Sequence, residues 1–171
     1  MGCGRVAAME TLAMNAATPQ CPRPLSVLLG LVPRAAHETA LVTVLNQLLA
    51  PALRRGELDF LRGRILRLGV TDMQLTFALT LGTGRLLACR DWRRPDLTID
   101  GVLYDFLLLA TRREDPDTLF FNRRLRLGGD TELGLYVKNF LAAQELDAGH
   151  RGVRIMNGAT DLLERLGRRR A

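Results

Sequence analysis

The sequence predicts an α+β domain in which helices cover one face of a mainly antiparallel sheet of about five strands. Two observations lead to this prediction. Between residues 66 and 100, apolar residues alternate with polar ones, which is the period of strands that bury one face. Before and after this stretch, apolar residues recur at helical spacing, as in residues 41–49 and 133–141.

The first helix is expected to begin after Pro33, because residues 1–24 end in a proline-rich stretch typical of a flexible arm. We expect Pro51 to kink this helix, and the cations and glycine at residues 54–56 to end it. Its apolar stripe consists of Leu41, Val44, Leu45, Leu48 and Leu49.

Four strands are expected next, over residues 66–71, 74–81, 86–90 and 96–100. The glycine-containing residues 82–85 form a hairpin turn between the second and the third. Each strand has one apolar and one polar face, so the sheet needs a cover on one side only.

Two helices follow. Asp100 is placed to cap a helix over residues 102–112. Asp115, followed by Pro116, has the pattern of a cap and first helical position, and predicts a short helix to residue 122.

A fifth strand is expected over residues 124–127, closed by Gly128 and Gly129. Asp130 or Thr131 then caps a long helix with an apolar face. We therefore expect three parts: a flexible arm over 1–24, one domain over 25–147, and a basic amphipathic segment over 148–171.

The net charge of +6 lies at the ends of the chain. Residues 151–171 hold six arginines against two acids, whereas residues 25–150 hold 16 cations and 15 anions. A nearly neutral body does not form a groove that follows a phosphate backbone, so the sequence argues against nucleic acid as a partner.

The chain has few groups suited to chemistry. His37 and His150 lie near no nucleophile and are expected to be exposed, and the three cysteines match no metal or redox spacing. The carboxylates near residues 115 and 130 stand at helix starts, where capping is their usual role. We predict no catalytic residue, no metal and no cofactor, and a reducing, cytoplasmic location.

The order of elements resembles the sterol carrier protein type-2 (SCP2) lipid-binding domain. Within it, residues 57–64 (ELDFLRGR), 115–125 (DPDTLFFNRRL) and 129–139 (GDTELGLYVKN) resemble the UbiT group of bacterial ubiquinone-biosynthesis accessory factors. The resemblance covers roughly residues 25–147.

This resemblance implies a non-catalytic accessory role in oxygen-independent ubiquinone biosynthesis. It implies binding of the polyprenyl tail of a quinone intermediate, or of a phospholipid, and work beside hydroxylation proteins of the UbiU and UbiV type. A polyprenyl tail loses roughly 0.8 kcal/mol for each methylene-sized unit exposed to water, so its carrier needs an apolar cavity.

The candidate cavity walls are the apolar sheet face and the helix stripes that would cover it. A stripe of this kind is also what an ordinary core requires, so both interpretations stay open. The candidates are Leu75, Phe77, Leu79, Leu97, Ile99, Leu103, Phe106, Leu107, Leu133, Tyr136, Val137, Phe140 and Leu141.

The C-terminal segment combines an apolar stripe with arginines, which suits transient contact with the inner face of the cytoplasmic membrane. A helix that packs on the domain as a lid is the alternative. The docking candidates are Arg154, Leu162, Leu163, Arg165, Leu166, Arg168, Arg169 and Arg170.

A different class of function also fits the sequence. The chain could be a protein–protein scaffold for biosynthetic enzymes, with no ligand in its cavity. Lipid that co-purifies in stoichiometric amount separates a carrier from a scaffold.

Overall fold

The computed structural model describes residues 33–89, 94–144 and 151–168. Five strands form one sheet in the order β3-β2-β1-β4-β5. β1 and β4 are parallel and the other neighbouring pairs are antiparallel, which confirms the predicted five-stranded, mainly antiparallel sheet. The strands are β1 (Leu66–Val70), β2 (Leu75–Leu81), β3 (Leu86–Ala88), β4 (Leu97–Gly101) and β5 (Arg126–Gly129).

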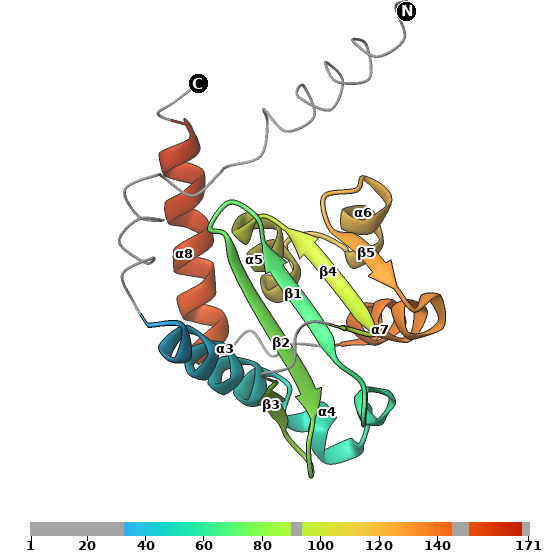
Figure 1. Cartoon of the computed structure of the whole chain (residues 1–171). Helices are drawn as coiled ribbons and strands as arrows, with labels where there is room; N and C mark the ends of the chain where they lie inside the picture. The colour runs from blue at the N-terminus through green and yellow to red at the C-terminus, as the bar shows by residue number, and fades with distance from the viewer. Residues whose placement is uncertain (1–32, 90–93, 145–150, 169–171) are drawn as a thin grey trace, which may run out of the picture.

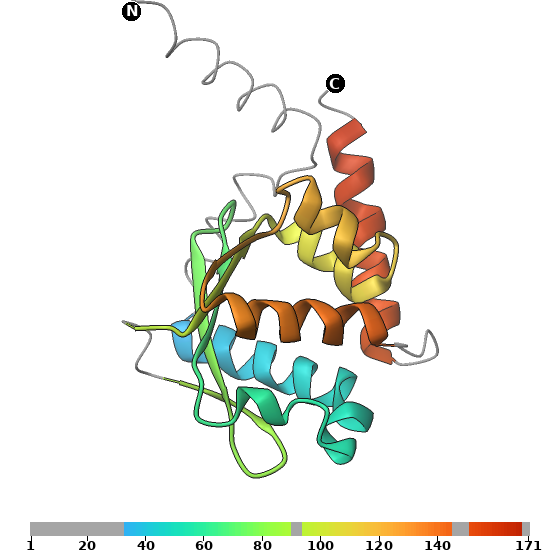
Figure 2. The same ribbon diagram turned by 90° about the vertical axis from the view of Figure 1, so that its right-hand side faces the viewer.

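The described helices all lie on one side of the sheet (Figures 1 and 2). This arrangement confirms the predicted α+β fold with helices over one face. The helices are α3 (Arg34–Leu48), α4 (Ala50–Arg55), the 3-10 turn η1 (Asp59–Leu61), α5 (Leu103–Thr111), α6 (Pro116–Phe121), α7 (Thr131–Ala143) and α8 (Arg151–Arg168).

The register of the sheet gives its two faces opposite character. Leu68 pairs with Phe77 on one side and with Ile99 on the other, so these three side chains share the helix-covered face. On the other face, the side chains of Arg67 and Asp100 form an ion pair at 3.6 Å. The apolar face is therefore the covered one, as the alternation predicts.

The helix that contains Pro51 breaks at Leu49, two residues before the predicted kink. α3 ends at Leu48 and α4 begins at Ala50, because proline at the start of α4 has no N–H to continue the ladder. Gly56 ends α4 in the left-handed conformation, at φ 73°. Asn46 of α3 then fixes the edge strand β3: its side-chain amide donates to the carbonyl of Leu86 at 2.9 Å and accepts from its N–H at 2.8 Å.

The predicted cap of α5 is wrong. Asp100 lies within β4 and points to the open face of the sheet, toward Arg67. The side chain that accepts a hydrogen bond from the start of α5 is Asp72, in the β1–β2 turn, whose Oδ1 lies 2.9 Å from the Leu103 nitrogen. A residue distant in sequence replaces the local cap because the parallel β1–β4 pairing brings that turn beside α5.

The fifth strand lies two residues later than predicted. β5 runs from Arg126 to Gly129, and the two glycines expected to end it instead pair with Thr98 and Leu97 of β4. Gly129 has φ 104°, and a Cβ there would lie 2.3 Å from the carbonyl oxygen of Asp96. Only glycine fits this close approach, so the residues that resembled a turn belong to the strand.

The other predicted local signals are confirmed. Asp115 caps α6 by accepting from the Thr118 nitrogen at 3.2 Å, and Asp130, rather than Thr131, caps α7 through Glu132 and Leu133. Residues 82–85 form the hairpin turn. The predicted arm over residues 1–24 lies outside the described residues.

Asp96, just before β4, joins that strand to β1 and α7 at one end of the sheet. Its carboxylate accepts from the Ile65 nitrogen at 2.7 Å and from Arg64 at 3.0 Å, next to the start of β1. Its carbonyl accepts from the nitrogen of Asp130, the cap of α7. The hydrogen bond from the Ile65 N–H, followed by the contact with Arg64, holds the pKa of the Asp96 carboxyl below its usual value.

We expect Asp96→Asn to lower the free energy of unfolding by about 1–3 kcal/mol at neutral pH, because a charge-assisted hydrogen bond is lost. A lowered folded-state pKa contributes stability above the unfolded-state value near 4, and that stability is lost as the pH falls. The difference between wild type and variant should therefore shrink below about pH 4, measured by urea unfolding. Asp59→Asn, at an exposed ion pair with Arg62, is the control and should cost less than about 1 kcal/mol.

Candidate apolar binding site

The centre of the covered sheet face is less well buried than its position requires. Leu68 lies on β1, the middle strand, between Phe77 and Ile99. Ile99 is 3% exposed and Phe77 is 7% exposed, whereas Leu68 is only partly buried. A central leucine beneath a helical cover is normally among the most buried residues of a domain. The helices therefore leave Leu68 incompletely covered.

Not all buried apolar side chains between the sheet and the helices belong to the main core. The main core joins α4, η1, α6 and α7 to the sheet, and contains Leu97, Ile99, Leu133 and Val137. Leu68 packs against this core and pairs with Phe77, which is buried but is not a member of it. We call the buried apolar residues of the sheet, α3, α5 and α8 that lie outside the main core the α8-side apolar layer; they are Leu48, Val70, Phe77, Leu79, Leu107, Leu108 and Leu163.

Helix α8 closes this layer from the outside. It packs against α5 and α3 (Figure 1). Thr160 is fully buried and Leu163 is 5% exposed, whereas Leu162 is 53% exposed. The buried positions show which side of α8 meets the domain.

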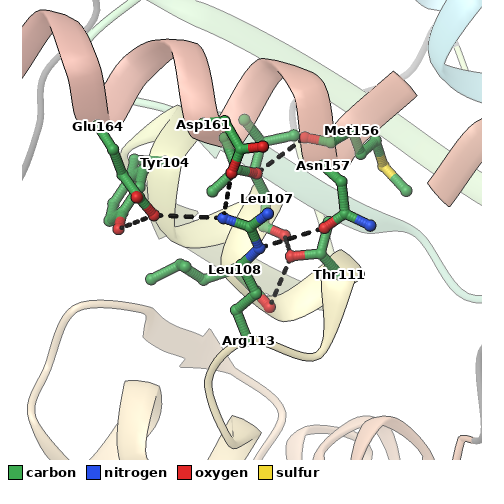
Figure 3. A network of polar contacts seen from close by, with 10 residues as sticks. Tyr104, Leu107, Leu108, Thr111, Arg113, Met156, Asn157, Asp161 and Glu164 are labelled. Carbon is green, nitrogen blue, oxygen red and sulfur yellow. Dashed lines mark hydrogen bonds and ion pairs between the residues drawn. The ribbon is translucent and has the colours of Figure 1, made fainter. Parts of the chain in front are cut away.

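A polar network joins the outer edge of α8 to α5 (Figure 3). The guanidinium of Arg113, just after α5, lies 2.7 Å from Asp161 and 3.4 Å from Glu164, and its Nε donates to Asn157 at 3.2 Å. The Tyr104 hydroxyl donates to Glu164 at 3.2 Å. Burial, with the neighbouring Glu164 carboxylate, raises the pKa of Tyr104. We call this network the α8 clasp.

The predicted wall residues occupy the interior with one exception. Tyr136 is 51% exposed and stacks on Phe60 with ring centroids 6.0 Å apart, at the outer rim of the main core. Leu75, Leu103, Phe106, Phe140 and Leu141 are partly buried. The buried candidates are Phe77, Leu79, Leu97, Ile99, Leu107, Leu133 and Val137.

The structure divides these candidates between the two groups. Phe77, Leu79 and Leu107 belong to the α8-side apolar layer, whereas Leu97, Ile99, Leu133 and Val137 belong to the main core, where tight packing is their role. The predicted set also missed residues. Leu68 could have been found from its alternation with Arg67 and Gly69, but Leu48 and Leu163 enter the layer only through the packing of α3 and α8.

The predicted docking residues do not lie on one face. Leu163 of α8 is buried against the domain, so it cannot enter a membrane while the helix stays packed. Leu162 and Arg165 are exposed. The side chains of the other five lie outside the described set: Arg154, Leu166, Arg168, Arg169 and Arg170.

No group of three or more metal-ligating side chains occurs among residues 33–89, 94–144 and 151–168. Asp105 is 2% exposed and bonds to Arg124; burial raises the pKa of its carboxyl, and the arginine opposes that shift. His37 is partly buried, contrary to the prediction, while His150 lies outside the described residues.

In the part of the chain that the structure describes, no helix is both long enough and apolar enough to cross a bilayer.

We expect Arg113→Met to loosen α8 without unfolding the domain. The methionine keeps an apolar stem but removes every ion pair of the clasp, and exposed pairs contribute up to about 1 kcal/mol. A local loss of stability of about 1 kcal/mol increases the rate of amide hydrogen exchange about fivefold. Exchange should therefore accelerate in α8 and stay unchanged in β1 and β2.

Arg85→Met is the matched control, because Arg85 is exposed in the hairpin turn and far from the clasp in sequence. It should leave α8 exchange at the wild-type rate. Equal exchange in the two variants would show that the clasp does not hold the helix.

Comparisons with known proteins fit this geometry. The model of the SCP-2 sterol transfer family matches residues 45–142. The "Ubiquinone biosynthesis accessory factor UbiT" of Escherichia coli strain K12 is 42% identical over 135 residues, which cover 79% of this chain and 77% of that protein. These similarities confirm the family resemblance predicted from the sequence.

Two solved structures are also similar. One is described as "UbiJ-SCP2 Ubiquinone synthesis protein", with TM-score 0.47 and 20% identity, covering 63% of this chain and 91% of that chain. The other is the sterol carrier protein domain 2 of Helicoverpa armigera, with TM-score 0.48 and 14% identity, covering 63% and 90%.

Proposed function

Because this chain belongs to the SCP-2 sterol transfer family, we propose that it binds a lipid in the α8-side apolar layer and serves ubiquinone biosynthesis as a non-catalytic accessory factor. The observation that carries the proposal is the incomplete burial of Leu68 at the centre of a covered sheet. The identity to UbiT supports the ubiquinone pathway.

The proposed ligand is the polyprenyl tail of a quinone intermediate, or the acyl chains of a membrane phospholipid. Both are long, flexible and apolar, and each methylene-sized unit removed from water contributes roughly 0.8 kcal/mol. Leu68, Phe77 and Leu107 offer such a chain carbon contacts, while the α8 clasp supplies charged groups that remain partly exposed. An apolar lining with polar groups at its rim suits a ligand with an oily tail and a polar head.

The proposed setting is the oxygen-independent route, in the cytoplasm with transient contact at the inner face of the membrane. There the chain works beside hydroxylation proteins of the UbiU and UbiV type. Its part is to hold an insoluble intermediate while other proteins carry out the chemistry.

We expect Leu68→Trp to reduce bound lipid at least severalfold, because the larger ring occupies the space beside the central strand. The measurement is native mass spectrometry and lipid extraction of the purified protein. Thr80→Trp is the matched control, since Thr80 lies on β2 but on the opposite face of the sheet. Wild-type protein without stoichiometric lipid would contradict binding and leave the scaffold role.

In cells that lack this chain, we expect ubiquinone to fall during growth without oxygen and to stay near normal in air. Ubiquinone extracted from the two cultures and quantified by chromatography tests the pathway. Wild-type protein supplied from a plasmid should restore the anaerobic pool, and the Leu68→Trp variant should restore it poorly. An unchanged anaerobic pool would remove the ubiquinone role.

A further inference from the structure

Exposed apolar side chains gather on the side of the domain formed by α6, β5 and α7. Phe121, the last residue of α6, is 89% exposed, Leu135 of α7 is 57% exposed and Leu127 of β5 is 37% exposed. Figure 2 views the molecule from this side, with α7 in front and α6 above it. Large apolar side chains exposed on adjoining elements are the kind of feature that marks an interaction site.

Printed contacts connect these residues into one surface. Asp117, one turn before Phe121 on α6, forms an ion pair with Lys138 of α7 at 3.1 Å. Lys138 lies one turn after Leu135 on α7. The Leu127 side chain lies beside Gly134, 3.9 Å from where a Cβ would stand. We call the edge of the domain that carries Phe121, Arg123, Arg126, Leu127 and Leu135 the α6–β5 rim; β5 is the edge strand, with Leu127 on its helix-covered side and Arg126 on its open side.

The charge of the rim is positive. Residues 121–129 contain three arginines and no acid. Arg124 is held by Asp105 and Glu114, but Arg123 and Arg126 are exposed and form no ion pair with a described residue. Arg126 pairs across the sheet with Asp100, whose carboxylate already contacts Arg67. Asp117 is neutralised by Lys138, and Asp100 is already paired with Arg67, so residues 121–129 keep a net positive charge.

We infer that the α6–β5 rim is the surface by which this protein docks on an anionic phospholipid membrane. Phe121 enters the interfacial zone of the bilayer, where aromatic rings are favoured, and Arg123 and Arg126 meet lipid phosphates. The rim protrudes at a helix end, which suits insertion into a soft surface. The inference depends on the proposed function in one respect: the docked protein needs a ligand to collect from the membrane.

Docking through the rim and docking through the C-terminal segment have different structural requirements. The docking set predicted on α8 includes Leu163, which is buried against the domain and becomes available only if the helix moves away. The rim needs no rearrangement, because Phe121, Arg123 and Arg126 are exposed in the packed structure. Docking through the rim therefore leaves the α8 clasp closed.

The test is co-flotation of the full chain with vesicles of phosphatidylglycerol and phosphatidylethanolamine, and with pure phosphatidylcholine vesicles. We expect binding to the anionic vesicles only, weakened by added salt. Phe121→Ala should reduce that binding about tenfold, as should the double variant Arg123→Ser with Arg126→Ser. The double variant Arg54→Ser with Arg85→Ser removes two exposed arginines elsewhere and should bind within twofold of wild type.

Three results would overturn the inference: no binding of wild type to anionic vesicles, undiminished binding of Phe121→Ala, or a loss produced by Leu162→Ala but not by Phe121→Ala. The Phe121→Ala protein should retain its co-purified lipid, whereas Leu68→Trp should lose lipid and keep vesicle binding. These opposite patterns separate failure of membrane docking from failure of the interior site.

Discussion

The parallel pairing of β4 with β1 is the constraint on which the rest of the structure depends. It places β4 in the sheet next to the first strand, with Leu66 opposite Leu97 and Leu68 opposite Ile99. Asp96 holds one end of the pair, and the hydrogen bond from the Thr71 nitrogen to the Gly101 carbonyl, at 2.8 Å, holds the other. A slip of one residue would turn the apolar side chains of β4 to the open face. The register therefore creates the covered apolar face.

The same pairing places polar and apolar side chains on opposite faces of the sheet. Arg67 and Asp100 meet on the open face, while the leucines and Phe77 face the helices. The α8 clasp joins two helices through side chains that remain partly exposed, while the buried Asp105 is neutralised by Arg124. An interior made mainly of aliphatic and aromatic carbon can hold an oily chain. This division supports a carrier.

Local signals predicted most of the elements because they act within a few residues. Proline at the start of α4, glycine at its end and aspartate before α6 and α7 each act within one helical turn, and the structure confirms them. The predictions failed where a distant residue decides. Asp72 took the place of Asp100 at the start of α5, and β5 moved so that glycine could pass the Asp96 carbonyl.

The sequence by itself determined the class of fold, the apolar face of each strand and the shortage of catalytic groups, since these follow from residue type and period. Only the tertiary structure decided which apolar residues are tightly packed and which border the looser layer. Leu97 and Leu68 look alike as alternating strand residues, yet one is 1% exposed and the other partly buried. Their burial depends on how closely helices approach the sheet, and that distance is set by side chains far apart in the chain.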